Sequence, residues 1–222
     1  MTDLEFAVAD LIADRYAAAP SLTVRLRITE TTGAVVHAVA LRCQIRIEPQ
    51  RRPYDDATAE RLADLFGGRE RWRDTLRPFL WTHAAMMVPG FTTDIEVDLP
   101  VACTYDFDVA AAKYLHAVRD GDVPLVLLFS GTVFTRGATG FSVEQIPWHK
   151  DVEVRLPAAV WRAVMDVHFP NSAWIRIPRD TLDALAAYKG RHGLLGWEDT
   201  LDSLLAAEAA AAAAAATPGA HR

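Results

Sequence analysis

Cysteine and lysine are scarce in this 222-residue chain, which has two cysteines and only three lysines among its 23 basic residues. Cys43 and Cys103 each lie in an apolar, strand-like run, and neither has a partner at the spacing of a zinc finger. Such thiols are most often small buried hydrophobic residues. We therefore expect no disulfide framework and no cysteine-based metal centre.

Long apolar runs are missing too, because none approaches the roughly 18 residues of a membrane-spanning helix. The first residues, MTDLEFAVADL, carry acidic side chains where a signal peptide would carry positive charge. An apolar fraction of 51% with a mean hydropathy of +0.06 is ordinary for a protein that folds in water. We expect a cytoplasmic protein with reduced thiols and no membrane span.

The charge balance argues against nucleic acid as a partner. The net charge is -6, whereas binding to phosphates requires a basic face. Basic residues cluster at 51–52 and 69–77, but acidic residues from Asp55 to Asp74 are interleaved with them. A mixed, solvated surface is the simpler interpretation.

Strand patterns dominate the first two thirds of the chain. Residues 22–30 and 35–47 alternate apolar and polar side chains with the period of two that is typical of a sheet with one wet face. The short link around Gly33 predicts that these two runs form a hairpin. Residues 4–11, 93–105, 124–134, 141–146 and 152–156 are further predicted strands, and 79–88 is either a short helix or an irregular strand.

Helices are predicted in the connections and in the last third. Asp55 or Thr58 is expected to cap a helix that ends at the glycine pair 67–68, and Asp180 to cap another that ends at Gly190. The sequence thus predicts a mainly β (α+β) fold, an antiparallel β-sandwich or curled sheet with helical insertions and C-terminal helices. We expect one globular domain over 1–205, with a helical insertion at 48–81, a helical C-terminal part at 157–205 and an alanine-rich, disordered or frayed tail at 206–222.

No set of residues has the spacing of a catalytic or metal site. The seven histidines never lie three or four residues apart, and Ser130 lacks the Gly-x-Ser-x-Gly elbow. The acidic pairs Asp106/Asp108 and Asp120/Asp122 could bind calcium, but helix capping and a turn explain them without an ion. We therefore predict no cofactor, no metal and no catalytic residue.

Aromatic and arginine side chains concentrate in the connection 47–81 and near 148. Tryptophan and arginine are enriched at interface hot spots, so an exposed cluster would indicate a protein partner. The alternative is that the rings cover an open end or edge of the sheet. The predicted partner-binding residues are Arg51, Arg52, Tyr54, Trp72, Arg77, Phe79, Trp81, Trp148 and His149.

Segments spread over residues 4–204, among them RIEPQRRPY, TLRPFLW, AAAKYLHAV and DGDVPLVLLFSGTVF, resemble an uncharacterised actinobacterial family of unknown function. Genes of that family lie near operons of high-affinity [NiFe]-hydrogenases. The resemblance implies an accessory protein of an uptake hydrogenase, with a hydrogenase subunit or maturation factor as partner. It assigns no catalytic residue, and the lack of cysteine or histidine groups argues against a nickel carrier or an iron–sulfur subunit.

Two hypotheses follow. The first is a non-catalytic accessory or protein-binding module that uses the connection 51–81, with a homo-oligomer left open. The second is a small enzyme or metal-handling protein with a site built from scattered residues such as His83, Asp106, His149 and Asp151. A structure distinguishes them by showing whether those four side chains converge.

Overall fold

The computed structural model describes residues 2–104, 106, 109–137, 140–170, 172 and 175–216. Internal contacts divide the chain into two compact units, residues 1–175 and 176–222, and each is described by itself. That residues 1–205 form a single domain stays a prediction. In the described part of the chain, no helix is long and apolar enough to cross a membrane.

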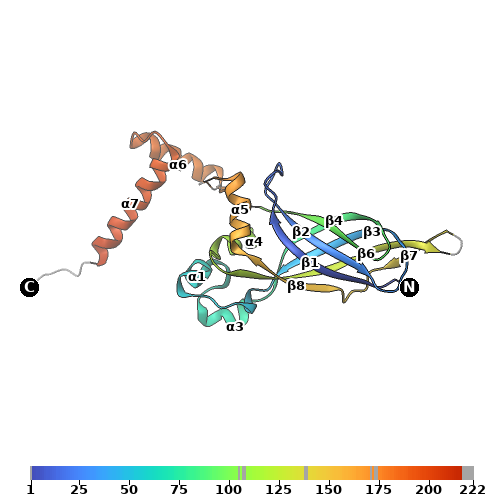
Figure 1. The fold of residues 1–222 in the computed structure, drawn as a ribbon. Coiled ribbons are helices and arrows are strands. Elements are labelled where there is room, and N and C mark those ends of the chain that lie inside the picture. The colour runs from blue at the N-terminus through green and yellow to red at the C-terminus, as the bar shows by residue number, and fades with distance from the viewer. Residues whose placement is uncertain are drawn as a thin grey trace, which may run out of the picture. The chain divides into compact units, whose positions relative to one another are not determined.

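Antiparallel strands form two sheets in the first unit (Figure 1). One sheet has the order β1-β2-β5, and the other has the order β4-β3-β6-β7, with β8 also paired to β6. The mainly β fold class is thereby confirmed. The strands are β1 (Leu4–Ala13), β2 (Ser21–Glu30), β3 (Val36–Ile47), β4 (Phe79–Phe91), β5 (Asp94–Ala102), β6 (Asp122–Gly137), β7 (Gly140–Gln145) and β8 (Asp151–Pro157).

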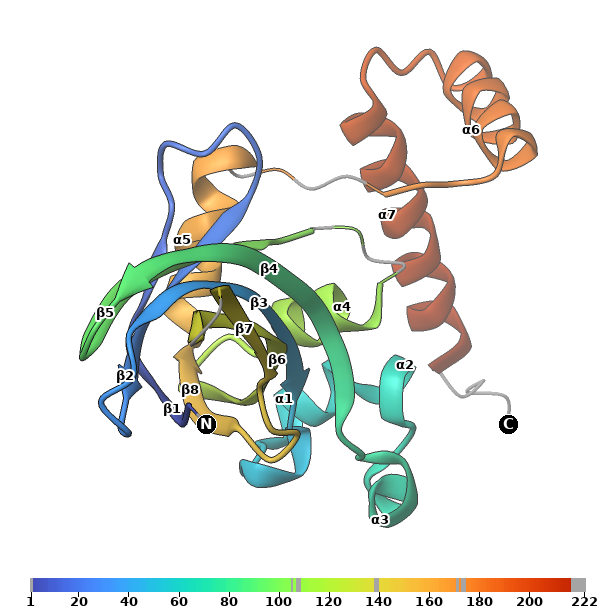
Figure 2. The same cartoon turned by 90° about the vertical axis from the view of Figure 1, so that its right-hand side faces the viewer.

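Helices of the first unit gather at one end of the strands (Figures 1 and 2). They are the 3-10 helices η1 (Pro49–Arg51) and η2 (Arg69–Arg71) and the helices α1 (Asp56–Arg61), α2 (Ala63–Phe66), α3 (Trp72–Thr75), α4 (Ala110–Ala117) and α5 (Ala158–His168). The second unit is a pair of helices, α6 (Arg179–Arg191) and α7 (Trp197–Ala216), joined by a hydrogen bond between the Tyr188 and Ser203 hydroxyls. Residues 206–216 belong to α7, so fraying of the predicted tail stays a prediction.

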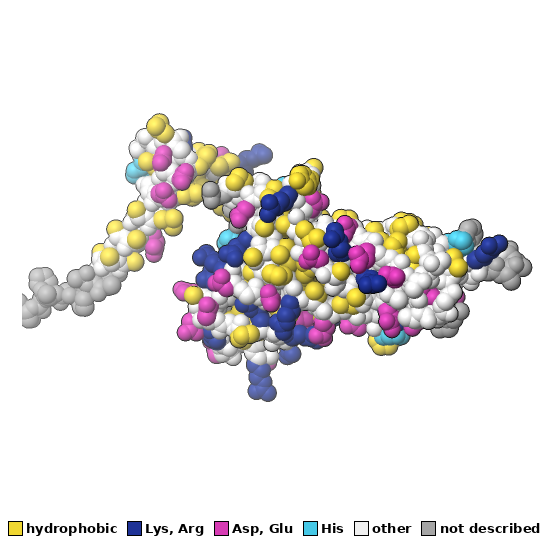
Figure 3. Space-filling view, viewed as in Figure 1, with side chains coloured by type: hydrophobic (Ala, Val, Ile, Leu, Met, Phe, Trp, Pro, Cys, Tyr) yellow, Lys and Arg dark blue, Asp and Glu magenta, His cyan; other side chains and the backbone are white. Residues whose placement is uncertain are grey.

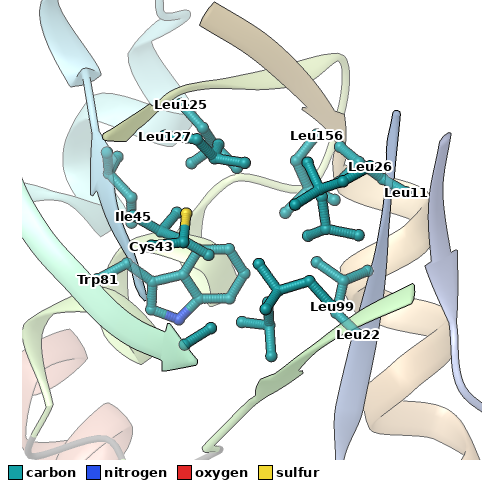
Figure 4. Packing of buried hydrophobic residues seen from close by; sticks show 14 of the residues in the cluster. Leu11, Leu22, Leu26, Cys43, Ile45, Trp81, Leu99, Leu125, Leu127 and Leu156 are labelled. Carbon is teal, nitrogen blue, oxygen red and sulfur yellow. The ribbon is translucent and has the colours of Figure 1, made fainter. Parts of the chain in front are cut away.

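The core lies between the two sheets, where the inward residues of each strand meet (Figure 4). Cys43 and Ile45 of β3 face Leu22 and Leu26 of β2 in one buried cluster. The period of two seen in the sequence is what places these residues on one side of each strand. The Phe6 and Phe129 rings stack at 4.2 Å and connect the sheets further along.

The predicted hairpin of residues 22–30 and 35–47 is wrong, because β2 and β3 belong to different sheets. β2 pairs with β1 and β5, whereas β3 pairs with β4 and β6. The connection from β2 in one sheet to β3 in the other is held by the buried Glu30. Its carboxylate accepts hydrogen bonds from the backbone amides of Asp3, Thr32 and Ala34. Alternation fixes the inward face of a strand and says nothing about which strand lies beside it.

Several local predictions can also be compared with the structure. Asp55 caps α1 by accepting a hydrogen bond from the Thr58 amide at 2.7 Å, as expected. Residues 79–88 form a strand, with a register shift opposite Ile45. The two predictions about α6 are wrong: Pro178 precedes the first helical residue, and Asp180 lies inside the first turn. Gly190 is also helical, and the positive φ of 64° falls on Gly193.

Candidate functional site

The insertion between β3 and β4 is held to the rest of the unit by the half-buried Tyr54 and the buried Tyr114. The Tyr54 hydroxyl lies 2.6 Å from the Pro49 carbonyl oxygen and 2.6 Å from the hydroxyl of Tyr114 on α4. A carbonyl oxygen can only accept, so Tyr54 donates to Pro49 and Tyr114 donates to Tyr54. Burial raises the pKa of both phenols, to about 12 for Tyr114, so both stay neutral and the contact persists at physiological pH.

The other aromatic rings of the insertion pack inward as well. The Trp72 indole N–H donates to the Gly67 carbonyl at 3.0 Å, and its ring meets Tyr54 edge-on at 5.2 Å. Phe79 meets the Tyr114 ring edge-on at 5.7 Å. Both side chains are half-buried. Most of their contact area is therefore used within the protein and is not available to a partner.

Arginines of the insertion bind the end of the sheet. Arg52 donates to the backbone carbonyls of Asp120 and Asp122 at 3.1 and 3.0 Å. Arg51 pairs with Glu153 of β8. Arg77 is exposed, and its Nε donates to the nearby Asp74 carbonyl at 3.3 Å, its one hydrogen bond among the described residues. Among the predicted arginines, Arg77 is thus the one whose guanidinium is bound only locally.

The predicted tryptophans fall into opposite environments. Trp81 is 9% exposed and meets Trp161 of α5 edge-on at 6.2 Å, inside the core (Figure 4). Trp148 is 89% exposed, in the turn between β7 and β8, with its ring 5.9 Å from that of His149. The turn lies beside Phe129 of β6, whereas the insertion lies beside Leu125 of the same strand. Four residues of a strand span about 13 Å, so the turn and the insertion are about that far apart.

The predicted site residues therefore do not form one surface. The tyrosine, Trp72 and the first two arginines come together at the insertion, Trp81 is buried, and the pair Trp148–His149 stands apart. Figure 3 shows acidic and basic side chains interspersed over the helical insertion, in agreement with a mixed, solvated surface. Partner binding by the predicted set stays a prediction.

Two residues of the second hypothesis, His83 and Asp151, are separated across the five-stranded sheet. His83 on β4 lies opposite Gln44, which lies opposite Leu128, which lies opposite Asp151 on β8. Three strand spacings, or about 14 Å, thus separate the histidine from the aspartate. Within the described residues, no group of three histidine, cysteine or acidic side chains could hold a metal ion. Of the calcium alternative, Asp108 lies outside the described residues.

Sequence reasoning missed the outer face of the five-stranded sheet. Alternate residues of β3 point outward there, with Ala40 opposite Met87 and Arg42 between Ala85 and Ser130. Met87 is 63% exposed, and Val143 of β7 is 58% exposed. In the described part of the chain, Arg42 has neither an ion pair nor a hydrogen bond from its side chain. The signal in the sequence is that β3 and β4 contain no acidic residue.

The outer face of the three-stranded sheet is built differently. Arg25 on β2 pairs with Asp98 on β5 at 3.0 Å, and Arg27 pairs with Asp94 at 2.8 Å. Within each of these cross-strand ion pairs the two charges neutralise each other, which leaves a polar, water-exposed face with little net charge. The two outer faces of one sandwich thus differ in charge balance and in apolar exposure.

A family model described as a family of unknown function (DUF6084) matches residues 1–213. The chain belongs to this family. A search of curated proteins found no match to this DUF6084 member.

Solved structures similar to this DUF6084 member are distant. A β-glucosidase from Kluyveromyces marxianus has a TM-score of 0.25 at 10% identity and aligns with 69% of this chain, which spans 15% of that enzyme. β-Glucosidase 3B from Thermotoga neapolitana has a TM-score of 0.23 at 12% identity, over 69% of this chain and 17% of its own. A provisionally named ApaA protein from Bordetella pertussis has a TM-score of 0.24 at 14% identity, with coverages of 70% and 95%. Similarity at this level supports no inference about activity.

Proposed function

We propose that this protein is a non-catalytic protein-binding module and that its contact surface is the outer face of the five-stranded sheet. The carrying observation is the difference between the two outer faces. One carries ion pairs such as Arg25–Asp98. The other exposes Met87, Val143 and Arg42, and within the described residues the Arg42 side chain forms no ion pair. Exposed apolar groups with polar neighbours are typical of interaction sites on soluble proteins.

The chemistry of this face favours a protein partner with a carboxylate among apolar groups. Small neighbours, Ala85 and Ser130, flank Arg42 and leave its guanidinium accessible to a bidentate carboxylate. Methionine adapts to irregular apolar surfaces, and arginine is frequent among interface hot spots. At the edge of the same sheet, the exposed Trp148 offers an aromatic anchor.

The identity of the partner is proposed from the sequence resemblance. It points to a subunit or a maturation factor of an uptake [NiFe]-hydrogenase, met in the cytoplasm. The insertion then has a supporting role, because Tyr54, Arg51 and Arg52 fix it to the sheet end. From the predicted residues, the proposed surface retains Trp148 and His149.

Recovery of the partner by affinity-tagged variants tests the proposal. Met87→Glu places a charge in the proposed surface, and Arg42→Gln removes its central cation. Ala7→Glu and Arg27→Gln are matched controls, since both residues lie on strands of the three-stranded sheet and are exposed. We expect the first two to lose the partner and the controls to retain it. Full recovery with a stably folded Met87→Glu variant would show that the surface is wrongly placed.

A further inference from the structure

The helices α4 and α5 lie at the helical end of the sandwich (Figure 2). A groove lined by side chains of both helices lies there. Its volume is about 300 Å³, at the lower end of the range for ligand pockets. Leu115 on α4 and Trp161 and Met165 on α5 line it with buried apolar side chains. Because the packed core fixes these three residues, the groove has a preformed apolar wall.

Positive charge borders this groove from both helices. Arg119 follows α4 and Arg162 lies on α5, and both line the groove and are exposed. Neither guanidinium has an ion pair or a hydrogen bond in the part of the chain that the structure describes. The carboxylate that lines the groove is that of Asp166. Two unpaired cations against one carboxylate leave a net positive rim.

His116 reports the same electrostatic environment. It lines the groove, and its pKa is lowered by burial, by Arg119 and by Arg61 of α1. The neighbouring guanidiniums disfavour a further positive charge, so the imidazole is kept neutral at neutral pH. An anion seated between the arginines would oppose this effect and raise the histidine pKa. The structure thus contains its own probe for bound negative charge.

We infer that the α4–α5 groove binds a small organic carboxylate whose apolar body lies against Trp161 and Met165. The planar guanidiniums of Arg119 and Arg162 match the bidentate geometry of a carboxylate. The apolar wall favours a ligand with a hydrocarbon or aromatic body over a bare inorganic anion. This site is separate from the outer sheet face and does not depend on the proposed function.

Histidine and methionine NMR signals of the full-length protein test this inference directly. Octanoate is the probe, octanamide is its uncharged match, and inorganic phosphate and acetate are anions without an apolar body. We expect octanoate alone to shift the Met165 methyl signal in a saturable titration and to raise the pKa of His116. Arg119→Gln and Arg162→Gln should each weaken binding roughly fivefold, as removal of one exposed charge pair does.

Arg155→Gln is the matched control, because Arg155 is an exposed arginine on β8 that does not line this groove. It should bind octanoate like the parent. Equal shifts with octanamide would show that charge is not recognised, and equal shifts with phosphate would show that the apolar wall is not used. Either result would overturn the inference, as would a titration with no saturable shift at millimolar octanoate.

Discussion

The direction of the hydrogen bonds at the Tyr54–Tyr114 pair leads to an asymmetric prediction for two similar substitutions. Tyr114→Phe removes a donor and leaves the bond from Tyr54 to Pro49 in place. Tyr54→Phe leaves two groups without partners, the Tyr114 hydroxyl and the Pro49 carbonyl. Tyr54 is less buried than Tyr114, yet its substitution is expected to lower the stability more.

The magnitudes follow from the groups left unpaired. A lost hydrogen bond costs about 0.5–1.5 kcal/mol, and a buried polar group without a partner costs about 1–3 kcal/mol. We expect Tyr114→Phe to lower the free energy of unfolding by about 1 kcal/mol and Tyr54→Phe by about 2–4 kcal/mol. The double variant leaves only the Pro49 carbonyl unpaired, so it should cost less than Tyr54→Phe alone.

Urea unfolding followed by near-ultraviolet circular dichroism measures these differences. Tyr16→Phe serves as the control, since Tyr16 is exposed and its substitution should change nothing. The three variants and the parent form a double-mutant cycle with a coupling energy of about 1–2 kcal/mol. A larger cost for Tyr114→Phe than for Tyr54→Phe, or additive costs, would refute the assigned hydrogen-bond directions.

Three further predictions concern stability. Burial raises the pKa of the Cys43 thiol and of the Tyr114 phenol to about 12, so both stay protonated in the folded protein after the unfolded chain has ionised. Their contribution to the free energy of unfolding should be complete below about pH 9 and lost as the pH rises toward 12. The midpoints of urea unfolding at pH 8 and at pH 11 measure this loss. For Glu30, burial tends to raise the pKa, but hydrogen bonds from Thr32, Asp3 and Ala34 lower it overall. Its stabilisation is therefore present above about pH 4.5 and lost as the pH falls further, and Glu30→Gln should flatten the acid side of a stability profile. Leu62→Ala leaves a cavity in the core and should lower the free energy of unfolding by about 2–5 kcal/mol and the thermal midpoint with it. Trp148→Ala removes an exposed side chain and should leave the thermal midpoint unchanged.

Alternation predicted the core of the sandwich but not its topology. Burial alternates along β2 and β3 as the sequence pattern predicts, because side chains on a strand alternate whatever its neighbours are. The wrong hairpin arose because the short link around Gly33 suits a tight turn and also a crossing between sheets. What decides between them is long-range, namely the hydrogen bond from the Asp3 amide to the buried Glu30 and the pairing of β2 with β5.

Exposure of the candidate site residues was the harder quantity to predict. Trp81 and Trp148 belong to the same residue type, and both follow a proline within a few residues, yet one is buried and the other is exposed. Their environments depend on strand register and on α5, which brings Trp161 against Trp81. Likewise, Arg52 binds backbone carbonyls distant in sequence, so its structural role could not be found from local spacing.

Site-specific photo-crosslinking in the native host tests the central claim most directly. A photoreactive amino acid replaces Met87 on the outer face of the five-stranded sheet, or Ala7 on the three-stranded sheet as the control. We predict a discrete adduct with one protein from position 87, absent from position 7 and lost when Arg42→Gln is added. An adduct from position 7 alone, or none from position 87 in a folded variant, would contradict the assignment of this face as the partner-binding surface.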